Sequence, residues 1–538
     1  MRQIIKQIGI FLGYEPDKPA KRTGKSGKAS AIAGIFATCE WLITAFTVTL
    51  IFIVFFMQAY TIPTGSMADT LKGAHFRLRC EKCGYRYDYG FSPEAYGMPQ
   101  NYAPRQNVPI LAYNSRTGFT QNLPKCPCCG YYSTTAQDMP VIKGDRIFVA
   151  KCLYQFFEPK RWDSIVFKNP VEPRINYIKR LIGKPGERIE IIDGDIYVDG
   201  TIARKPPKVQ NELWMPIYDN DFQPSDPHVR GYNGHKWSQP FVNAKNSDWN
   251  LNAKGPTVFS LDGSDDDMHT LIYDTSRGND FKATYGYNDP KKFDSIMPIC
   301  SDLMMCFYLL DNDFTGTVGT VLSKYGVKYF AKIDSSGRME ILMADGDGQS
   351  RVLETKQINV NKQKNKKFEF CNVDHSLIFK FGNEQLRHDF GTGADDMGDR
   401  NSGVLPEAMI FGSGKITIGH IGLFRDIHYI NRETLYVNNQ YVTGGPVRAG
   451  EGNPFTLGDN EFFACGDNSP NSFDSRLWDV AGRANGQNEY RTGIVPRDYL
   501  VGKAFFVYWP GAFKPNDKSR IQFIPYIGGM KRIYGGTE

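Results

Sequence analysis

A serine in a tight turn is the first residue of this chain whose surroundings suit nucleophilic chemistry. Ser66 lies in TIPTGSMADTL (61–71), directly after a long apolar run. Pro63 and Gly65 end any helix at this point and predict a turn that presents the serine side chain. A serine hydroxyl is a weak nucleophile, so an adjacent base must come from elsewhere in the chain. Without such a base, Ser66 would be an ordinary turn residue.

Lys179 is the candidate base. It lies in INYIKRL (175–181), where strict alternation places Ile175, Tyr177 and Lys179 on one face of a strand. A lysine on an apolar face loses hydration, which lowers the pKa of its amine and suits it to act as a general base. The alternative is a solvated strand lysine, which is how we interpret the neighbouring Arg180.

A polar turn near the end of the chain is a candidate support for this chemistry. FFACGDNSPNSFDSRLW (462–478) packs turn-forming residues around Asp474 and Arg476. Burial of such a turn requires that its polar groups be paired, and Asp474 can pair with Arg476 or with Lys503. The eight histidines lie outside all of these stretches, which argues against a Ser-His-Asp triad.

Two cysteine clusters form a candidate metal site. Cys80-Glu-Lys-Cys83-Gly and Cys126-Pro-Cys-Cys129-Gly are separated by a loop rich in Tyr, Pro and Asn. Four thiolates in two such knuckles predict tetrahedral zinc in a zinc ribbon, with Cys80, Cys83, Cys126 and Cys129 as ligands and Cys128 as a bystander. Two disulfides are the alternative, because we expect an oxidising compartment. The zinc would be structural, and we expect no cofactor for catalysis.

The element that must position Ser66 is an apolar segment of membrane length. WLITAFTVTLIFIVFFMQAY (41–60) has no charged residue. Its roughly 20 residues suffice to span a hydrocarbon core, with Trp41 and Tyr60 as interfacial aromatics. Basic residues near the N-terminus place residues 1–40 in the cytoplasm and the chain after the span outside. We expect a single-pass protein of the cytoplasmic (inner) membrane, because the long basic leader argues against a cleaved signal peptide.

Composition favours β structure and excludes a nucleic-acid-binding role. The chain of 538 residues is rich in glycine and aromatic residues, and helical periodicity is scarce after the first segment. The net charge of +6 lies largely near the N-terminus, as expected of a membrane flank and not of a nucleic-acid-binding patch. We therefore expect a mainly β fold with one N-terminal transmembrane helix and no nucleic-acid partner.

The strand pattern divides the chain into parts. Residues 141–209 contain short alternating runs that end at Gly, Pro and Asp turns, and the same style returns after 432. Between them, regular short strands with polar turns predict an inserted, jelly-roll-like β-sandwich, loosely similar to concanavalin- or laminin-G-like domains, that contributes no catalytic group. The expected parts are a basic cytoplasmic N-terminus (1–40), a transmembrane helix (41–60), a first body part (61–209) with the cysteine loop 80–130, the sandwich (210–431), a second body part (432–512) and a C-terminal tail (513–538).

Four sequence motifs resemble those of bacterial type I signal peptidases, membrane-bound Ser/Lys proteases that remove signal peptides. IPTGSMADTL is similar to the nucleophile motif, GDRIFVAK to the next motif, YIKRLIGKPGERIEI to the lysine motif and GDNSPNSFDSR to the last motif. They occur in the family's order behind an apolar segment. The chain departs from the family's pattern at Ala68-Asp69, Ala464-Cys465 and Ser469-Pro470. The resemblance implies a signal-peptidase-type β body.

The resemblance also implies roles for individual residues. Ser66 is the nucleophile and Lys179 the general base. Thr64 would add its hydroxyl to an oxyanion hole beside the backbone N–H of Ser66. Three residues of the last motif would support the site: Ser472 by orienting the amine of Lys179, and Asp474 and Arg476 by bracing the loop. The family's substrate pockets are shallow and apolar, and the residues expected to line them are Ile62, Met67, Ile147 and Ile178.

The activity implied by the resemblance is removal of signal peptides from exported preproteins at the outer face of the membrane. Cleavage is expected after Ala-x-Ala-like sites, with membrane lipid and preproteins as partners. One alternative is a membrane-tethered binding protein whose sandwich recognises a glycan, peptide or protein ligand. A Ser/Lys self-cleaving regulator is another, but such proteins lack this membrane segment.

Overall fold

The computed structural model describes most of the chain in two separate units. The described residues are 27–99, 107–114, 118–121, 124–133, 138–311, 313–344, 349–363, 366–398, 400, 403–437, 440–483, 489–513, 524–525 and 527–536. The expected cytoplasmic segment before residue 27 and most of the expected tail lie outside these residues. The two units are Met1–Phe56 and Met57–Glu538. Each is described by itself.

The first unit contains one long helix, α2 (Gly27–Phe55). Its stretch Gly34–Ile51 is long and apolar enough to cross a membrane, by length and composition. The helix begins and ends earlier than the expected segment 41–60, whose bounds as a membrane span stay a prediction. The helix begins earlier because the preceding residues are rich in alanine, a strong helix former. It ends before Met57, because Met57–Thr61 form strand β1 and pair their backbone groups with another strand.

An antiparallel eight-stranded sheet, which we call the body sheet, forms the body of the second unit. Its strand order is β1-β8-β37-β9-β10-β33-β36, with β40 pairing β37. Strands that precede the sandwich in the sequence alternate in this sheet with strands that follow it. The sheet is therefore complete only when the chain has returned from the sandwich. The bounds are β8 Arg146–Ala150, β9 Ser164–Lys168, β10 Asn176–Gly183, β33 Glu461–Cys465, β36 Val495–Pro496, β37 Leu500–Trp509 and β40 Lys531–Arg532.

Smaller elements complete the body. A four-stranded sheet of order β13-β12-β11-β32 comprises β11 Arg188–Ile192, β12 Asp195–Val198, β13 Thr201–Ile202 and β32 Phe455–Thr456. The cysteine loop contains β3 Arg86–Gly90, β4 Val108–Pro109, β5 Leu111–Asn114 and β6 Gly118–Gln121, and it is flanked by β2 His75–Arg79 and β7 Asp138–Met139. Short helices are α3 Leu153–Phe156 and α4 Pro207–Leu213.

The inserted block contains two seven-stranded antiparallel sheets. One has the order β14-β29-β20-β25-β26-β27 with β18 pairing β29, and the other has the order β17-β19-β28-β21-β22-β23-β24. A single large core of buried apolar side chains draws on strands of both sheets. The first sheet comprises β14 Met215–Asp219, β18 Val258–Asp262, β20 Leu303–Leu309, β25 Lys367–Val373, β26 Ser376–Phe381, β27 Glu384–Asp389 and β29 Lys415–Arg425. The second comprises β17 Phe241–Asn243, β19 His269–Tyr273, β21 Thr317–Lys324, β22 Val327–Asp334, β23 Arg338–Ala344, β24 Ser350–Gln357 and β28 Ala408–Ser413.

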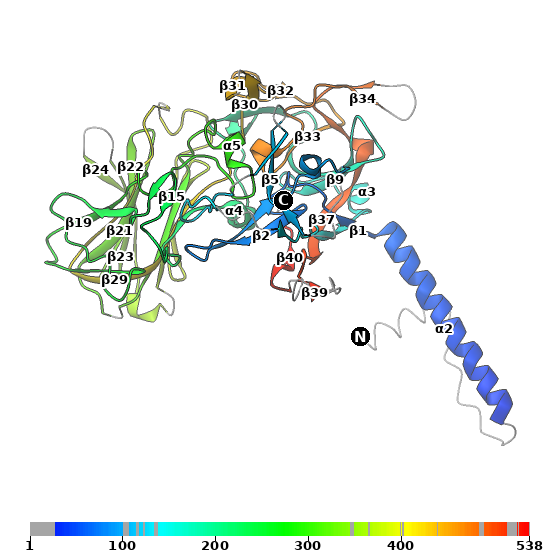
Figure 1. Ribbon diagram of the computed structural model, residues 1–538, viewed down its shortest axis with the longest axis horizontal. Helices are drawn as coiled ribbons and strands as arrows, with labels where there is room; N and C mark the ends of the chain where they lie inside the picture. The colour runs from blue at the N-terminus through cyan, green and yellow to red at the C-terminus, as the bar shows by residue number, and fades with distance from the viewer. Residues whose placement is uncertain are drawn as a thin grey trace. The chain divides into compact units, whose positions relative to one another are not determined.

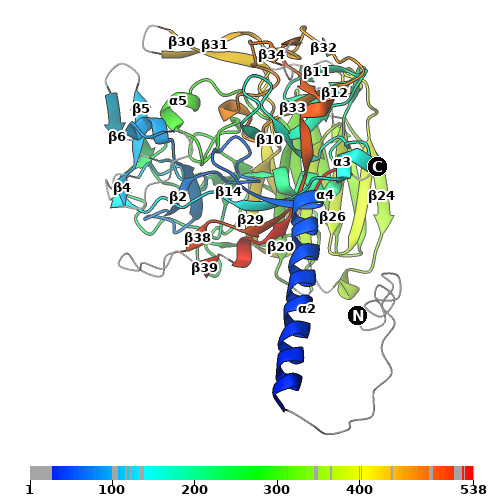
Figure 2. The same ribbon diagram turned by 90° about the vertical axis from the view of Figure 1, so that its right-hand side faces the viewer.

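The mainly β fold with a sandwich-like domain is therefore confirmed. The green and yellow strands of the sandwich lie together at one side of the second unit (Figure 1). Figure 2 shows the hairpin β30–β31 (Arg432–Val437 and Gln440–Pro446) beside β32 and β34 (Gly482–Arg483), at the opposite end from β38 and β39 (Ala512–Phe513 and Ile524–Pro525). The sandwich strands run only from β14 to β29, so the chain between β10 and β33 leaves the body sheet and returns to it.

Candidate active site

Ser66 lies in a hydrogen-bonded turn between β1 and β2. The backbone N–H of Ala68 donates to the carbonyl of Gly65 at 3.0 Å. At the base of the turn, the N–H of Ile62 donates to the carbonyl of Asp145 at 2.9 Å, which ties the turn to the chain that enters β8. The sequence folds this way because proline and glycine exclude a continuing helix. Ser66 is only half-buried, so its hydroxyl remains accessible.

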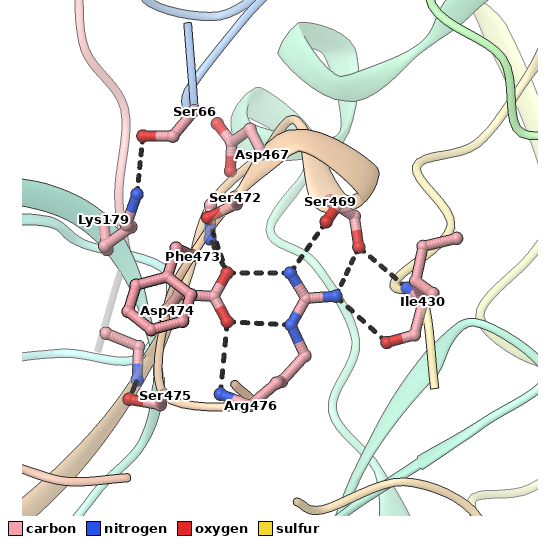
Figure 3. A network of polar contacts seen from close by, with 12 residues as sticks. Ser66, Lys179, Ile430, Asp467, Ser469, Ser472, Phe473, Asp474, Ser475 and Arg476 are labelled. Carbon is pink, nitrogen blue, oxygen red and sulfur yellow. Dashed lines mark hydrogen bonds and ion pairs between the residues drawn. The ribbon is translucent and has the colours of Figure 1, made fainter. Parts of the chain in front are cut away.

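Lys179 lies in β10, and its side-chain amine points toward the Ser66 hydroxyl. Its Nζ lies 2.5 Å from Oγ of Ser66, within hydrogen-bonding distance (Figure 3). The Lys179 side chain is 4% exposed. Burial lowers its pKa to about 8, against an opposing effect from the carboxylate of Asp474. Burial excludes a solvated lysine, and about one molecule in ten has a neutral amine at pH 7.

The polar turn that follows β33 is braced by a buried ion pair between Asp474 and Arg476. The guanidinium donates to Asp474 from Nε at 2.9 Å and from Nη2 at 2.7 Å. Burial raises the pKa of the Asp474 carboxyl, but the guanidinium outweighs this and holds the pKa below its usual value. Nη1 of Arg476 also donates to Oγ of Ser469 at 2.6 Å (Figure 3). The expected pair thus forms, whereas Lys503 pairs with Asp163 at 2.6 Å.

The two remaining hydroxyls expected in the site are placed differently. Oγ of Ser472 donates to Oδ2 of Asp474 at 2.6 Å, so it is tied to the bracing carboxylate. Its role in orienting the amine of Lys179 stays a prediction. Thr64 is exposed two residues before Ser66, and its contribution to an oxyanion hole also stays a prediction. Within the described residues, the backbone N–H of Ser66 donates to no acceptor.

Arg180 is not the solvated residue that the strand pattern suggested. Its side chain is fully buried and forms an ion pair with Asp467, which is also fully buried. Nη1 of Arg180 donates to the carbonyl of Trp162 at 2.9 Å. The correction has a physical cause, because β10 lies between β9 and β33 and every residue from Lys179 to Gly183 is buried, so side chains on both faces of this part of the strand are covered. In the sequence, the acidic Asp467 of Gly466-Asp467-Asn468 is the residue that could have indicated a partner for Arg180.

Three of the four residues expected to line substrate pockets belong to the core. Ile62, Met67 and Ile147 are 3%, 0% and 1% exposed, and they pack together with other apolar residues under the nucleophile turn. Apolar residues beside a tight turn gain more from this burial than from facing water. Ile178 is only partly buried against the same cluster. Of the four, only Ile178 has a partly open side chain that a substrate can contact.

The four expected metal ligands lie together. The Sγ atoms of Cys80 and Cys129 are 3.7 Å apart, as are those of Cys83 and Cys126. All four Sγ atoms lie within 4.8 Å of one another. A tetrahedron with zinc–sulfur bonds of about 2.3 Å has edges of about 3.8 Å, so the donor set fits zinc. A disulfide needs about 2.05 Å between sulfur atoms, and all four cysteines are free thiols.

Comparison with known proteins places the region around Lys179 among peptidases. The family model described as "Signal peptidase, peptidase S26" matches residues 131–228 and 426–509. These segments contain Lys179, Asp474 and Arg476. The nucleophile turn precedes them, so the proximity of Ser66 to Lys179 rests on the geometry alone.

Individual relatives cover part of the chain. Signal peptidase I of Rickettsia massiliae (strain Mtu5) is 26% identical over 186 residues, which are 34% of this chain and 48% of that protein. Signal peptidase I T of Bacillus subtilis (strain 168) is 41% identical over 63 residues, 12% of this chain and 32% of that protein. The chain thus spans about half the length, or less, of these curated relatives. A solved carbohydrate-binding module, CBM66 from Bacillus subtilis, aligns with a TM-score of 0.20 and 10% identity over 38% of this chain and 96% of that one. The two segments that form most of the body sheet and the polar turn are therefore similar to the signal peptidases of the peptidase S26 family.

Proposed function

We propose that this protein is a signal peptidase, a serine endopeptidase that cleaves signal peptides from exported preproteins with a Ser66/Lys179 dyad. The observation that carries the proposal is the 2.5 Å approach of the Lys179 amine to the Ser66 hydroxyl inside a buried site. A serine needs a base at this distance, and a lysine serves as that base only when its pKa is lowered. We infer that Lys179 meets both requirements, since its amine lies close to the Ser66 hydroxyl and burial lowers its pKa.

The mechanism follows from the two side chains. The neutral amine of Lys179 accepts the proton of the Ser66 hydroxyl as Oγ attacks the scissile carbonyl carbon. The ammonium then gives this proton to the leaving amine, and an acyl-enzyme remains on Ser66. A water molecule, deprotonated by the same amine, hydrolyses the ester and restores both residues. Burial of Lys179 matters in each step, because it keeps the amine able to accept protons near neutral pH.

The negative charge that develops on the substrate oxygen requires hydrogen-bond donors. The backbone N–H of Ser66, which donates to no acceptor among the described residues, is the first donor in our proposal. The hydroxyl of Thr64 is the second. Asp474 and Arg476 hold the loop that packs beside Lys179, and the carboxylate anchors the hydroxyl of Ser472.

Anchoring at the membrane is part of the proposal. We place α2 in the cytoplasmic (inner) membrane and the second unit on its outer face, in accord with the basic N-terminal residues. Only 10 residues separate the end of α2 at Phe55 from Ser66. A substrate whose hydrophobic segment is still in the lipid would therefore present its cleavage site close to the nucleophile.

A structural zinc ion is a second proposal, carried by the tetrahedral spacing of the four thiols. Cys80, Cys83, Cys126 and Cys129 would hold the ion, which would cross-link the two knuckles. Cys128 is not one of these four: its thiol contacts that of Cys83 and donates to the carbonyl of Asp219 at 3.4 Å. The ion would supply folding energy to the loop and no step of catalysis.

The test of the proposed function is direct. The purified protein, in detergent, is incubated with a preprotein, and the new N-terminus of the product is sequenced. We expect a single cut after the signal peptide, absent with the Ser66→Ala variant. An intact preprotein with the folded wild-type protein would refute the proposal.

A further inference from the structure

A connecting segment of the inserted block lies against the turn that carries Ser66. Residues 274–302 join β19 to β20 of the sandwich and contain the short helix α5 (Pro290–Phe293). Within this connection Tyr285, Tyr287 and Asn288 are 6%, 3% and 5% exposed. The polar atoms of their side chains bond to the loops of the body and not to the sandwich.

Asn288 and Asn468 form a reciprocal pair of amide hydrogen bonds. Nδ2 of Asn288 donates to Oδ1 of Asn468 at 2.7 Å, and Nδ2 of Asn468 donates to Oδ1 of Asn288 at 2.8 Å. Nδ2 of Asn468 also donates to the carbonyl of Gly65 at 3.0 Å. Asn288 therefore fixes the orientation of the amide that holds the Gly65 carbonyl.

The Gly65 carbonyl decides where the backbone N–H of Ser66 points. The two groups belong to one planar, trans peptide unit, so they point in opposite directions. The carbonyl accepts hydrogen bonds from the Ala68 N–H and from the Asn468 amide, and the second of these joins the turn to the body and helps to fix the N–H, which is the oxyanion donor in our proposed mechanism. A donor that is oriented before the reaction stabilises the transition state without a reorganisation cost.

The peptide on the other side of Ser66 is held in the same way. The backbone N–H of Asn468 donates to the carbonyl of Ser66 at 3.0 Å. That N–H shares a peptide unit with the carbonyl of Asp467, which accepts a hydrogen bond from the hydroxyl of Tyr285 at 2.9 Å. Two residues of the inserted block thus fix the two peptide units that flank the nucleophile.

Tyr287 closes the back of the same turn. A Cβ atom added to Gly65 would lie 2.1 Å from Cε1 of Tyr287, so only glycine fits beside this ring. The hydroxyl of Tyr287 donates to the carbonyl of Ala74 at 2.9 Å, near the end of the turn. The ring fills the space into which the turn would otherwise relax.

We propose that residues 285–288 of the inserted block position the nucleophile turn, with Asn288 acting through Asn468 and Tyr285 acting through Asp467. The proposal rests on the proposed peptidase function and deepens it. Neither residue touches the reacting atoms, so both are positioning residues. The insertion would then position the groups of the site without supplying a catalytic group itself.

The test compares Asn288→Ala with Asn372→Ala in the full-length protein. Asn372 is 2% exposed, and its amide joins Leu303 and Ser301 inside the block through two hydrogen bonds. Both variants therefore lose a buried amide with comparable bonding. For Asn288→Ala we expect kcat to fall about 10- to 100-fold with KM unchanged, since loss of a whole oxyanion donor costs roughly 100- to 1,000-fold. For Asn372→Ala we expect an unchanged kcat per folded molecule.

Tyr285→Phe supplies a second measurement if Asn288→Ala does not fold. It removes only the hydroxyl that holds the Asp467 carbonyl, and we expect a lower kcat with an unchanged KM. Equal kcat values for Asn288→Ala and Asn372→Ala, or an unchanged kcat for Tyr285→Phe, would overturn the proposal. Failure of the wild-type protein to cleave in a Ser66-dependent manner would instead overturn the proposed function.

Discussion

Arg180 and Asp467 form a bidentate ion pair in which Nε lies 2.7 Å from Oδ1 and Nη2 lies 2.6 Å from Oδ2. Both side chains are fully buried. Arg180 follows Lys179 on β10, and Asp467 precedes Asn468, whose backbone N–H holds the carbonyl of Ser66. The ion pair therefore links the strand of the proposed base to the loop that holds the proposed nucleophile.

Asp467→Asn is expected to destabilise the second unit strongly. The substitution leaves the guanidinium of Arg180 buried without a counter-charge, which typically costs 3–5 kcal/mol. The measurement is the free energy of unfolding in denaturant. The control is Glu158→Gln, which removes the partner of Arg497 from an exposed ion pair and should change the free energy by at most about 1 kcal/mol. Similar effects of the two substitutions would contradict a structural role for the buried pair.

Ser66 and Lys179 are expected to act as one unit. Ser66→Ala and Lys179→Ala should each abolish preprotein processing without unfolding the protein. The double variant should be hardly slower than either single variant, because each substitution already removes the whole reaction path. Single-turnover rates and thermal unfolding of all three variants provide the measurement. Near-normal turnover in either single variant would disprove the assignment.

The rate of processing is expected to rise with pH through about 8. Burial lowers the pKa of Lys179 to about 8, and only the neutral amine accepts the proton of Ser66. A profile of kcat/KM between pH 6 and 9.5 should therefore increase roughly tenfold per pH unit below the pKa and level off above it. A profile that is flat across this range would show that another group is the base.

The same pKa makes a prediction about stability. The pKa of Lys179 is about 8 in the folded protein, whereas a lysine exposed to water has an ordinary pKa of 10.5, so the unfolded chain binds the proton more tightly. The free energy of unfolding should increase as the pH rises from about 8 to 10.5. Lys179→Met should remove this slope and stabilise the protein at pH 7 by up to roughly 3 kcal/mol. A stability equal to that of the wild-type protein at all pH values would contradict the burial cost.

The sequence predicted those features that depend on local patterns. The β fold class follows from alternation and turn residues, and the nucleophile turn follows from proline and glycine at fixed positions. Lys179 was found because alternation placed it on the apolar face of its strand. The cysteine spacing identified four thiols that converge, as the distances between the Sγ atoms show.

Features that depend on distant contacts were missed. Arg180 was interpreted as solvated because alternation assigns a side chain to a face but does not show what covers that face. Its partner Asp467 lies 287 residues away. Asn288 carries no local signal at all, because it sits in a polar connection between two strands of the sandwich. A ligand for the sandwich stays a prediction, since its strand pattern fixes a fold and leaves the surface chemistry open.

Elemental analysis is expected to find about one zinc ion per chain. Cys83→Ser should lose the metal and lower the melting temperature, because one of four ligands to a structural ion is missing. Cys128→Ser is the matched control in the opposite knuckle, and it should keep the metal because its thiol lies outside the set of four. Two disulfides in a metal-free protein would refute the zinc site. Loss of the ion should leave the rate per folded molecule unchanged, since none of the four candidate ligands bonds to Ser66 or Lys179 within the described residues.

Substrate choice should depend on two small side chains before the cleaved bond. β1 is an edge strand of the body sheet, and Asn176–Ile178 of β10 pair with β9 only. The described strands thus leave backbone edges for an extended substrate near both Ser66 and Lys179. Main-chain pairing is indifferent to sequence, so the pockets for alternate side chains must supply the specificity.

The buried core under the turn leaves little depth for such pockets. Met67 and Ile147 are fully packed, and Ile178 alone among the expected pocket residues is partly open. We therefore expect cleavage after Ala-x-Ala-like segments that follow a hydrophobic stretch.

A peptide series that varies only the first and third residues before the cut measures this preference as kcat/KM. Phe or Leu at either position should reduce the rate by tenfold or more, because overfilling a packed site costs about 1–3 kcal/mol. A series that varies the second residue is the control, since that side chain points away from the sheet and should have little effect. Equal rates for Ala and Phe just before the cut would show that deeper pockets open during binding and that the packed core is not what limits substrate size.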